Sequence, residues 1–448
     1  MAIETEKNIF VKTVAASENL VKTWGGKPIK KAREYWHILG PGLTTGAADD
    51  DPSGITTYSQ TGAKYGFSLL WLAAFSFPLM ATVQEMCARI GLVTGRGLAG
   101  VIRRHFSRKV LYVTTVLLFL ANTFNIGADL GAMAKSTQLL LPRFNFVTLI
   151  IAFTVISLLL QIFTTYGSYA KYLKWAGLTL MSYVITATLI NIDGRSLLHY
   201  AFLPHINFTK DQFFLITGIL GTTISPYLFF WQTSQEVEEQ ILEGKTTLKL
   251  RQAETSKKEI KNMRIDIWSG MFFSNLVMFF IIFTCASTLN AAGLTNIGTA
   301  AEAAAALRPL AGNYAFLLFA VGVIGVGMLG VPVLAGSASY ALSETFGWRQ
   351  GLYYKFRQAH AFYGVIILSM ALGLLLNFVG LDPIKALIYS AVANGLVAPV
   401  VLILIVLISG NKKIMGAWAN RPLAKAVGWI TVGLMVASGA MTIISLFT

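Results

Sequence analysis

Three consecutive carboxylates, Asp49, Asp50 and Asp51, lie inside an apolar stretch and are followed by a proline and by Gly54. A charged aspartate at the centre of a bilayer costs at least ~2.5 kcal/mol, so acids at this depth usually face a wet cavity and mark an ion pathway. An unwound helix also exposes backbone carbonyls. These features predict an oxygen-lined cation site, with Asp51 as the charged ligand and Gly54 leaving room. The alternative, in which the acids lie in a loop, is disfavoured because the segment from Ile55 onward is too short and too polar to span alone.

A second interrupted stretch lies at residues 218–227, where glycines, hydroxyl residues and a proline fall within another apolar segment. About five predicted helices separate the two stretches. Paired broken helices at matching positions in two halves of a chain are typical of an inverted-repeat transporter, whose substrate site lies where both helices unwind. We therefore expect the carbonyl of Thr222 and the hydroxyl of Ser225 to face Asp51. The alternative is a simple proline kink, which neighbouring Ser and Thr residues tolerate.

Composition restricts the class of protein. Of the 448 residues, 55% are hydrophobic and only 13% are charged, whereas soluble domains carry about 25% charged residues. The net charge of +15 does not indicate a nucleic-acid partner, because Lys and Arg lie mostly in loops and do not cluster on one face. Cys87 and Cys285 lie in apolar stretches and indicate neither a disulfide framework nor a thiolate cluster. No catalytic constellation, nucleophile motif or phosphate loop is apparent, so we expect neither an enzyme nor a cofactor.

Windows of about 20 apolar residues, the length that spans a bilayer core, predict an all-α membrane protein of about eleven transmembrane helices. The windows are residues 38–62, 67–91, 111–141, 146–165, 172–191, 213–234, 265–289, 313–341, 361–378, 384–408 and 425–447. Lys and Arg concentrate in the N-terminal tail and in every second loop. This bias predicts a cytoplasmic N-terminus and an outside C-terminus in the plasma membrane.

The spans suggest a division of the chain. We expect a cytoplasmic tail at residues 1–37, helices one to five at 38–191, helices six to ten at 192–408, and a last helix within 409–448. The loop at residues 235–264 is rich in Glu and Lys, and we interpret it as a solvated cytoplasmic helix or a segment linked to a gate. Other polar residues inside the spans are interpreted first as interhelical hydrogen-bonding groups. They are Gln84, Glu85, Asn122, Asn125 and Asn275.

The motifs of this chain resemble those of the NRAMP divalent-metal transporters. The segments that carry the resemblance are Gly40–Gly42, Asp51–Gly54, Tyr65–Trp71, Ala88–Gly95, Ala128–Gly131, Asp382–Leu387 and Lys412–Gly416. The resemblance covers most of the chain. It implies a LeuT-like fold, in which two five-helix repeats are inverted relative to each other and helices 1 and 6 are broken. It also implies that Asp51 is the metal-binding aspartate.

Departures from the family pattern bear on the choice of ion. The family's Asp-Pro-Gly-Asn motif is Asp-Pro-Ser-Gly at residues 51–54, and its Met-Pro-His motif is Ser-Pro-Tyr at residues 225–227. In this resemblance Gly54 stands at the position of the family's asparagine ligand, and Ser225 stands at that of its methionine ligand. The position that supplies a backbone carbonyl ligand falls on Thr222. Loss of the thioether favours a hard ion over softer transition metals. This pattern looks like that of the NRAMP-related magnesium transporters.

The same comparison bears on proton coupling. The sixth-helix histidine of the family is Tyr227 here, and a third-helix acid is Ala132, although Asp129 remains. Histidine is the usual group that exchanges protons near neutral pH, and tyrosine, with an ordinary pKa near 10, is a poor replacement. We therefore predict transport that is not coupled to protons and is driven by the membrane potential, worth about 2.3 kcal/mol per charge per 100 mV.

Five further residues are expected near the ion or in its vestibule: Asp49, Asp50, Tyr227, Asp129 and Asn394. Asp49 and Asp50 stand where typical family members are uncharged. They would add negative potential around a hydrated cation, either at the site or in its vestibule. Asn394 lies where the tenth helix approaches the site, so it is a candidate contact for the ion or its waters.

The sequence therefore predicts a monomeric secondary transporter that moves divalent metal ions, foremost Mg²⁺ and also Mn²⁺, by alternating access. Its expected partners are the metal ion and the lipid bilayer. One alternative is a proton-coupled Mn²⁺ or Fe²⁺ importer of the typical family kind. Another is an organic-solute symporter of the same architecture, in which the helix ends would hold a carboxylate. Three clustered aspartates argue against an anionic group at that position.

Overall fold

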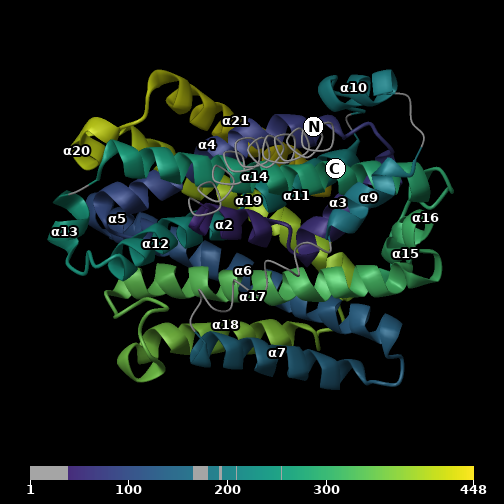
Figure 1. Cartoon of the computed structure of the whole chain (residues 1–448), viewed down its shortest axis with the longest axis horizontal. Coiled ribbons are helices and arrows are strands. Elements are labelled where there is room, and N and C mark those ends of the chain that lie inside the picture. Colours follow the sequence, from purple (N-terminus) through teal and green to yellow (C-terminus); the bar gives the residue numbers. More distant parts are fainter. Residues whose placement is uncertain (1–38, 165–179, 191–193, 208, 254, 448) are drawn as a thin grey trace, which may run out of the picture. The chain divides into compact units, whose positions relative to one another are not determined.

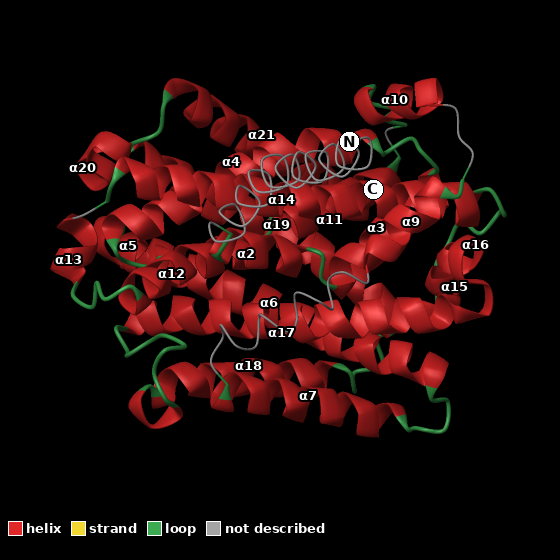
Figure 2. Cartoon of the chain, viewed as in Figure 1, coloured by secondary structure: helices red, strands yellow, loops and turns green. Residues whose placement is uncertain are grey.

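The computed structural model describes residues 39–164, 180–190, 194–207, 209–253 and 255–447. Every regular element within these ranges is a helix, as Figure 2 shows. The helices belong to one compact unit, Pro41–Thr448. The predicted tail at residues 1–37 lies outside the described residues. The structure therefore confirms the all-α class.

Seven helical stretches in the described part of the chain are long and apolar enough to cross a membrane. They contain α6 (Arg108–Leu140), α7 (Phe146–Phe163), α11 with α12 (Lys210–Thr223, Pro226–Leu242), α14 (Lys257–Cys285), α17 (Ala315–Phe346), α19 (Pro383–Gly410) and α21 (Pro422–Phe447). Three other predicted spans correspond to α4 (Trp71–Thr94), α18 (His360–Leu376) and a broken pair, α2 (Pro41–Asp49) with α3 (Pro52–Tyr65). Of the fifth predicted span, residues 172–179 lie outside the described residues, and α9 (Met181–Thr188) follows them.

Both predicted helix breaks are confirmed. Asp50 and Asp51 separate α2 from α3, and Ile224 and Ser225 separate α11 from α12. In each case a proline opens the second half, where its missing N–H needs no helical partner. The tenth predicted span, in contrast, is continuous, because α19 runs through Pro399.

The long helices form layers. Figure 1 shows α6 and α17 side by side, with α7 and α18 along one side of them and α4, α14 and α19 along the other. The halves α2 and α3 lie between α6, α14, α17 and α19. Outer helices expose large apolar side chains, as a lipid-facing surface must. On α7 these are Val147, Ile151, Val155, Ile156, Leu159 and Phe163.

Glycines bring α2 against α14 with backbone facing backbone. A Cβ atom on Gly46 would lie 2.3 Å from the carbonyl oxygen of Gly270, and one on Gly270 would lie 2.2 Å from that of Gly42. Small residues permit such close approach in membrane helices. The buried Asp266 of α14 completes the contact, since its carboxylate accepts from the backbone N–H of Gly42 at 2.6 Å and of Leu43 at 3.0 Å. It thereby satisfies donors at the start of α2.

The predicted solvated loop at residues 235–264 is partly wrong. The helix α12 continues to Leu242, followed by α13 (Leu248–Ala253) and by the start of α14 at Lys257. Glu236 and Glu238 are only 4% and 7% exposed, because neighbouring groups satisfy them. The side-chain amide of Gln232 donates to Glu236 at 2.9 Å, and a tyrosine and a backbone N–H donate to Glu238.

Segments predicted on the same side of the membrane meet in the structure. Arg251 of α13 donates to the carbonyl oxygen of Gly95, and both lie in loops assigned to the cytoplasm. Lys64 forms an ion pair with Asp211 at 2.7 Å, and both lie in segments assigned to the outside. The alternation of loops is therefore consistent, and which end faces the cytoplasm stays a prediction. Short helices that the sequence analysis missed lie between the spans: α5 (Leu98–His105), α10 (Gly194–Phe202) and α15 (Ala300–Ala304).

Candidate metal site at the two helix breaks

Asp51 occupies the N-cap of α3 and is 1% exposed. Its Oδ1 accepts from the backbone N–H of Gly54 at 2.8 Å and from the hydroxyl of Ser53 at 2.6 Å. Its Oδ2 accepts from the side-chain amide of Asn125 on α6 at 2.9 Å. The helix start and α6 therefore hold this carboxylate in place, with lone pairs left for a further ligand.

Asp49 and Asp50 are also buried, at 0% and 2% exposure. The hydroxyl of Ser274 on α14 donates to Asp49 Oδ2 at 2.5 Å and lies 3.4 Å from Asp50 Oδ1. Asp49 Oδ1 has no hydrogen-bond partner among the described residues. All three acids thus lie inside the helix bundle, so the alternative that placed them in a loop is wrong.

The aspartates point to different neighbours. Asp49 faces Ser274 of α14, whereas Asp51 faces Asn125 of α6. In the described part of the chain, no three side chains of the His, Cys, Asp or Glu type converge to hold a metal. A cation bound here would therefore depend on one carboxylate with backbone carbonyls, hydroxyls and water, which suits hard divalent ions.

At the second break, a side-chain hydroxyl binds carbonyl oxygens of the same broken helix. The hydroxyl of Ser225 donates to the carbonyl oxygen of Thr222 at 2.5 Å and lies 2.7 Å from that of Gly221. The predicted carbonyl ligand, Thr222, therefore has one lone pair engaged in this conformation. The Thr222 side chain connects the two broken helices, because its hydroxyl donates to the Tyr58 hydroxyl of α3 at 3.1 Å.

Tyr58 borders the space beside Gly54. A Cβ atom on Gly54 would lie 3.4 Å from Cε2 of the Tyr58 ring, an ordinary contact, and 3.3 Å from the carbonyl oxygen of Asp49, which is slightly tight. The ring from the next turn of α3 therefore limits this space, and the room that Gly54 leaves for an ion stays a prediction. Tyr58 is fully buried and was missed by the sequence analysis, because one tyrosine in an apolar helix is usually a packing residue.

Asp129 lies close to Asp51. Both border Gly330 of α17, where a Cβ atom would be 3.1 Å from the Cβ of Asp51 and 3.9 Å from Oδ2 of Asp129. Neither oxygen of Asp129 makes a well-formed hydrogen bond with a described residue, although the backbone of Ser53 faces the carboxylate. The structure therefore brings Asp129 into the site region, as predicted.

Two other predicted neighbours differ from each other. Tyr227 lies at the site region, since its hydroxyl donates to the carbonyl oxygen of Ala48 in α2 at 3.1 Å. Asn394 is fully buried in α19, and neither atom of its amide group has a partner among the described residues. Its helix packs on α11, because a Cβ atom on Gly395 would lie 2.4 Å from the Thr217 carbonyl oxygen. Direct contact between Asn394 and an ion stays a prediction.

Asn125 has a larger role than the one predicted. It is an interhelical hydrogen-bonding group, as expected, but its partner is Asp51 itself. Its own side-chain oxygen accepts from the hydroxyl of Ser390 on α19 at 2.8 Å. The chain Ser390, Asn125, Asp51 therefore connects three helices and orients the carboxylate. Spacing within the sequence gives no signal for this link, because it joins residues on different spans.

Comparison with known proteins agrees with this architecture. A family model described as "Natural resistance-associated macrophage protein-like" (Nramp) matches residues 42–445. The chain belongs to the Nramp family. Relatives named "Divalent metal cation transporter MntH" include one from Deinococcus radiodurans, 24% identical over 90% of this chain and 89% of that protein. Another, from Yersinia pestis, is 25% identical over 94% of this chain and 97% of that protein.

Solved structures show the same fold. A crystal structure of the Eremococcus coleocola manganese transporter covers 91% of this chain and 85% of its own, with a TM-score of 0.68 and 18% identity. The inward-facing conformation of Mhp1 covers 91% of this chain and 90% of its own, with a TM-score of 0.51 and 15% identity. This Nramp protein therefore has the LeuT-like fold with broken helices 1 and 6. The predicted nearness to the magnesium branch finds no support among these relatives.

Proposed function

We propose that this Nramp protein carries divalent metal ions across a membrane by alternating access, with the ion held between the two helix breaks. The observation that carries the proposal is the Asp51 carboxylate, which lies 1% exposed at the break of an intramembrane helix. A buried carboxylate is costly unless a cation or hydrogen-bond donors offset its charge. The names of the relatives, all divalent metal cation transporters, support the same function.

The charge around the break favours a cation. In the described residues no Lys, Arg or His lies within 4.0 Å of Asp49, Asp50 or Asp51, because the four ion pairs all involve other acids. Asp51 would supply the direct carboxylate ligand, and Asp49 and Asp50 would add negative potential nearby. A doubly charged ion would offset this uncompensated charge.

The second break would supply the neutral ligand. The carbonyl oxygen of Thr222 becomes available to an ion when the Ser225 hydroxyl turns towards Gly221, whose carbonyl oxygen is also within reach. The sequence predicted Ser225 as a ligand in its own right. The contacts support a different role, in which its hydroxyl competes with the ion for the Thr222 carbonyl.

Manganese is the ion that the comparisons favour, since the structural relative from Eremococcus coleocola is named as a manganese transporter. Magnesium is a second candidate, because Ser225 removes the thioether that favours softer metals. We propose uptake without proton coupling, on the ground that Tyr227 and Ala132 replace two proton-exchanging groups of the family. The ion path lies within one chain, which is consistent with a functional monomer in the plasma membrane.

The test is uptake into proteoliposomes with Mn²⁺, Mg²⁺, Ca²⁺ and Cd²⁺. The native chain is compared with Asp51→Asn and with Asp211→Asn, a surface-exposed acid that forms an ion pair with Lys64. We expect Asp51→Asn to lose uptake of every ion and Asp211→Asn to keep it. Normal uptake by Asp51→Asn would refute the site.

The choice of ion needs a second variant. Ser225→Met restores a thioether, so it should raise Cd²⁺ and Mn²⁺ uptake relative to Mg²⁺ if position 225 faces the ion. A native chain that transports Mn²⁺ but not Mg²⁺ would remove magnesium as a candidate. A pH-sensitive dye inside the vesicles should report no proton entry during uptake, and acidification would show that coupling is retained.

A further inference from the structure

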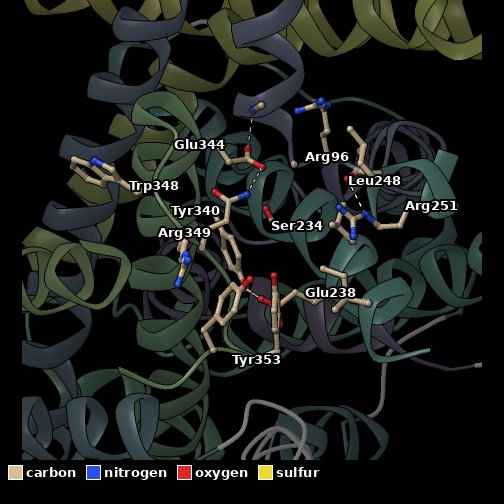
Figure 3. Close-up of a pocket in the computed structure, with 18 of the residues that line it drawn as sticks. Arg96, Ser234, Glu238, Leu248, Arg251, Tyr340, Glu344, Trp348, Arg349 and Tyr353 are labelled. Carbon is tan, nitrogen blue, oxygen red and sulfur yellow. Dashed lines mark hydrogen bonds between the residues drawn. The ribbon is translucent and has the colours of Figure 1, made fainter. Parts of the chain in front are cut away.

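A cavity of about 340 Å³ lies away from the helix breaks, where the ends of several helices meet. Its walls come from the end of α4 and the start of α5, from the last turns of α12, from α13, and from the end of α17 with the segment that follows. We call it the arginine cavity, and Figure 3 shows its lining. Its volume lies at the small end of the range of about 300–1,000 Å³ that is usual for ligand pockets.

Positive charge dominates the lining. The arginines are Arg96, Arg103, Arg251 and Arg349, and they outnumber the two carboxylates, Glu238 and Glu344. Figure 3 shows Arg96 and Arg251 on one side of the cavity and Arg349 on the other. Among the described residues, none of these arginines lies within 4.0 Å of a carboxylate, since the ion pairs are elsewhere. No carboxylate of the described residues therefore pairs directly with these guanidinium groups.

Both carboxylates are engaged in holding the walls. Glu344 accepts from the backbone N–H of Gly100 at 2.8 Å and from the side-chain amide of Gln350 at 2.8 Å. Glu238 accepts from the Tyr340 hydroxyl and from the backbone N–H of Leu352 at 2.5 Å. These acids thus fix the segment after α17 against α5 and α12. Their hydrogen bonds fulfil a structural role that leaves the arginines facing the cavity.

The arginines are held in place by neutral partners. Arg251 donates to the backbone carbonyls of Gly95 at 3.1 Å, Lys245 at 3.1 Å and Thr246 at 3.0 Å. Burial lowers the pKa of Arg251, and the nearby Arg96 adds to the lowering. Repulsion of this kind is relieved when an anion binds between two guanidinium groups.

Two donors in the lining lack partners. The Ser234 hydroxyl, in a residue that is 4% exposed, has no hydrogen-bond partner among the described residues. The same is true of Nε of Arg96. Buried donors without a partner are costly, and in a native structure they often mark a missing ligand or water. Together with the guanidinium groups they form a donor set suited to a tetrahedral, multiply charged anion.

We propose that the arginine cavity binds an anion that carries a phosphate group, with the arginines and Ser234 as its donors. The phosphate belongs either to a small soluble ligand or to the head group of an anionic lipid. Trp348 lines the cavity and stacks on the exposed Phe346 with ring centroids 4.9 Å apart, and aromatic side chains of this kind gather at membrane interfaces. A bound anion would cross-link α5, α13 and the end of α17. The inference does not depend on the transported ion.

The test measures binding of inorganic pyrophosphate by calorimetry, with EDTA present to remove divalent ions. The variant is Arg96→Gln with Arg349→Gln, which leaves the backbone contacts of Arg251 intact. The matched control is Arg421→Gln, an exposed arginine outside the cavity. We expect pyrophosphate to bind the native chain and the control, and the double variant to bind about tenfold more weakly or worse.

A second arm identifies the source of the phosphate. The three proteins are placed in nanodiscs of phosphatidylcholine alone or with phosphatidylglycerol, and their melting temperatures are compared. Stabilisation by phosphatidylglycerol that the double variant loses and the control keeps would support a lipid head group, even without pyrophosphate binding. If neither probe distinguishes the double variant from Arg421→Gln, the proposal is wrong.

Discussion

The two broken helices meet in one region but present different chemistry. The first break carries three buried aspartates and has no positive side chain within ion-pair distance among the described residues. The second carries no charged residue, and its Ser225 hydroxyl closes onto carbonyls of its own helix. One break therefore holds fixed charge and the other holds adjustable dipoles. The comparison indicates that attraction for a cation comes from α2 and α3, and that its final coordination depends on α11 and α12.

The difference has an energetic side. The Ser225 hydroxyl donates to the Thr222 carbonyl oxygen in this structure, so an ion that binds this oxygen must displace a hydrogen bond with a net value of about 1 kcal/mol. Asp51, in contrast, accepts from Gly54 and Asn125 and has further lone pairs for an ion. Changes at the first break should therefore have larger effects than changes at the second.

The largest expected effect is that of Asp51→Asn on ion binding. Loss of the charge should remove roughly 3 kcal/mol of binding free energy, about a hundredfold in Kd. Asparagine is as good an N-cap as aspartate, and the weaker hydrogen bond from Asn125 is opposed by removal of a buried charge. The melting temperature without metal should therefore change less than it does for Asn125→Ala. Isothermal titration with Mn²⁺ measures the first quantity and a thermal scan the second. An unchanged Kd would show that charge at the first break does not hold the ion.

The next variant is Gly54→Ala, which tests how much room the first break leaves. The added methyl would lie 3.3 Å from the carbonyl oxygen of Asp49, slightly tighter than usual, and 3.4 Å from the Tyr58 ring, an ordinary contact. We therefore expect a loss of about 1 kcal/mol of unfolding free energy, the low end of the cost of overpacking, measured by thermal unfolding. Gly364→Ala on α18 is the control, because a Cβ atom there meets nothing within 4 Å. A far larger loss for Gly54→Ala would show that the break has no room for a methyl group.

Asn125→Ala should reduce stability more than Gly54→Ala does. It removes the donor to Asp51 Oδ2 and the acceptor for Ser390, and a hydrogen bond to a charged group is worth about 1.5–3 kcal/mol. Ser390→Ala breaks only the neutral bond and should cost less. Thermal unfolding in detergent compares the two. A larger loss for Ser390→Ala would mean that Asn125 does not act through Asp51.

The smallest effect is expected for Ser225→Ala. Without the hydroxyl, the Thr222 carbonyl oxygen no longer accepts this hydrogen bond. The Kd for Mn²⁺ should therefore fall a few-fold, which corresponds to about 1 kcal/mol of binding free energy. Ser225→Ala should thus lower the Kd, whereas Asp51→Asn should raise it, so the two variants distinguish the roles of the two breaks. A rise in Kd on titration would instead make Ser225 a direct ligand, as the sequence suggested.

The sequence predicts the breaks well because their signals are strong. Proline, glycine and acids inside an apolar window have few explanations other than an interrupted helix lining a polar site. The locations of Asp51 and Thr222 follow from those interruptions. Tyr58 and Asn125 could not be found in this way, because their contacts depend on which spans pack together.

The segment at residues 235–264 was predicted less well, because its charged residues suggested a solvated loop. Glu236 and Glu238 have the charge of a solvated loop, yet Gln232, Tyr340 and a backbone N–H satisfy them inside the protein. A charge pattern alone does not distinguish an exposed carboxylate from one with buried donors. The ends of α12 and α14 were misplaced for that reason. The capping box of Ser256 and Glu259 at the start of α14 was a local signal for the correct boundary.

The glycine contact between α2 and α14 has a consequence for movement. Gly42, Gly46 and Gly270 bring backbone against backbone along this contact, and side chains of α14 bind α2 at both of its ends, Asp266 at the start and Ser274 at Asp49. Separation of the first half of the broken helix therefore requires these hydrogen bonds to break, but no large side chain has to move out of the way at the glycines. Larger residues are not tolerated at these glycines, because even one methyl group would clash with the backbone of the facing helix and push the two helices apart. A chain that acquired alanine at one of these positions would keep its ion ligands and still have lost a tight closure on one side of the membrane.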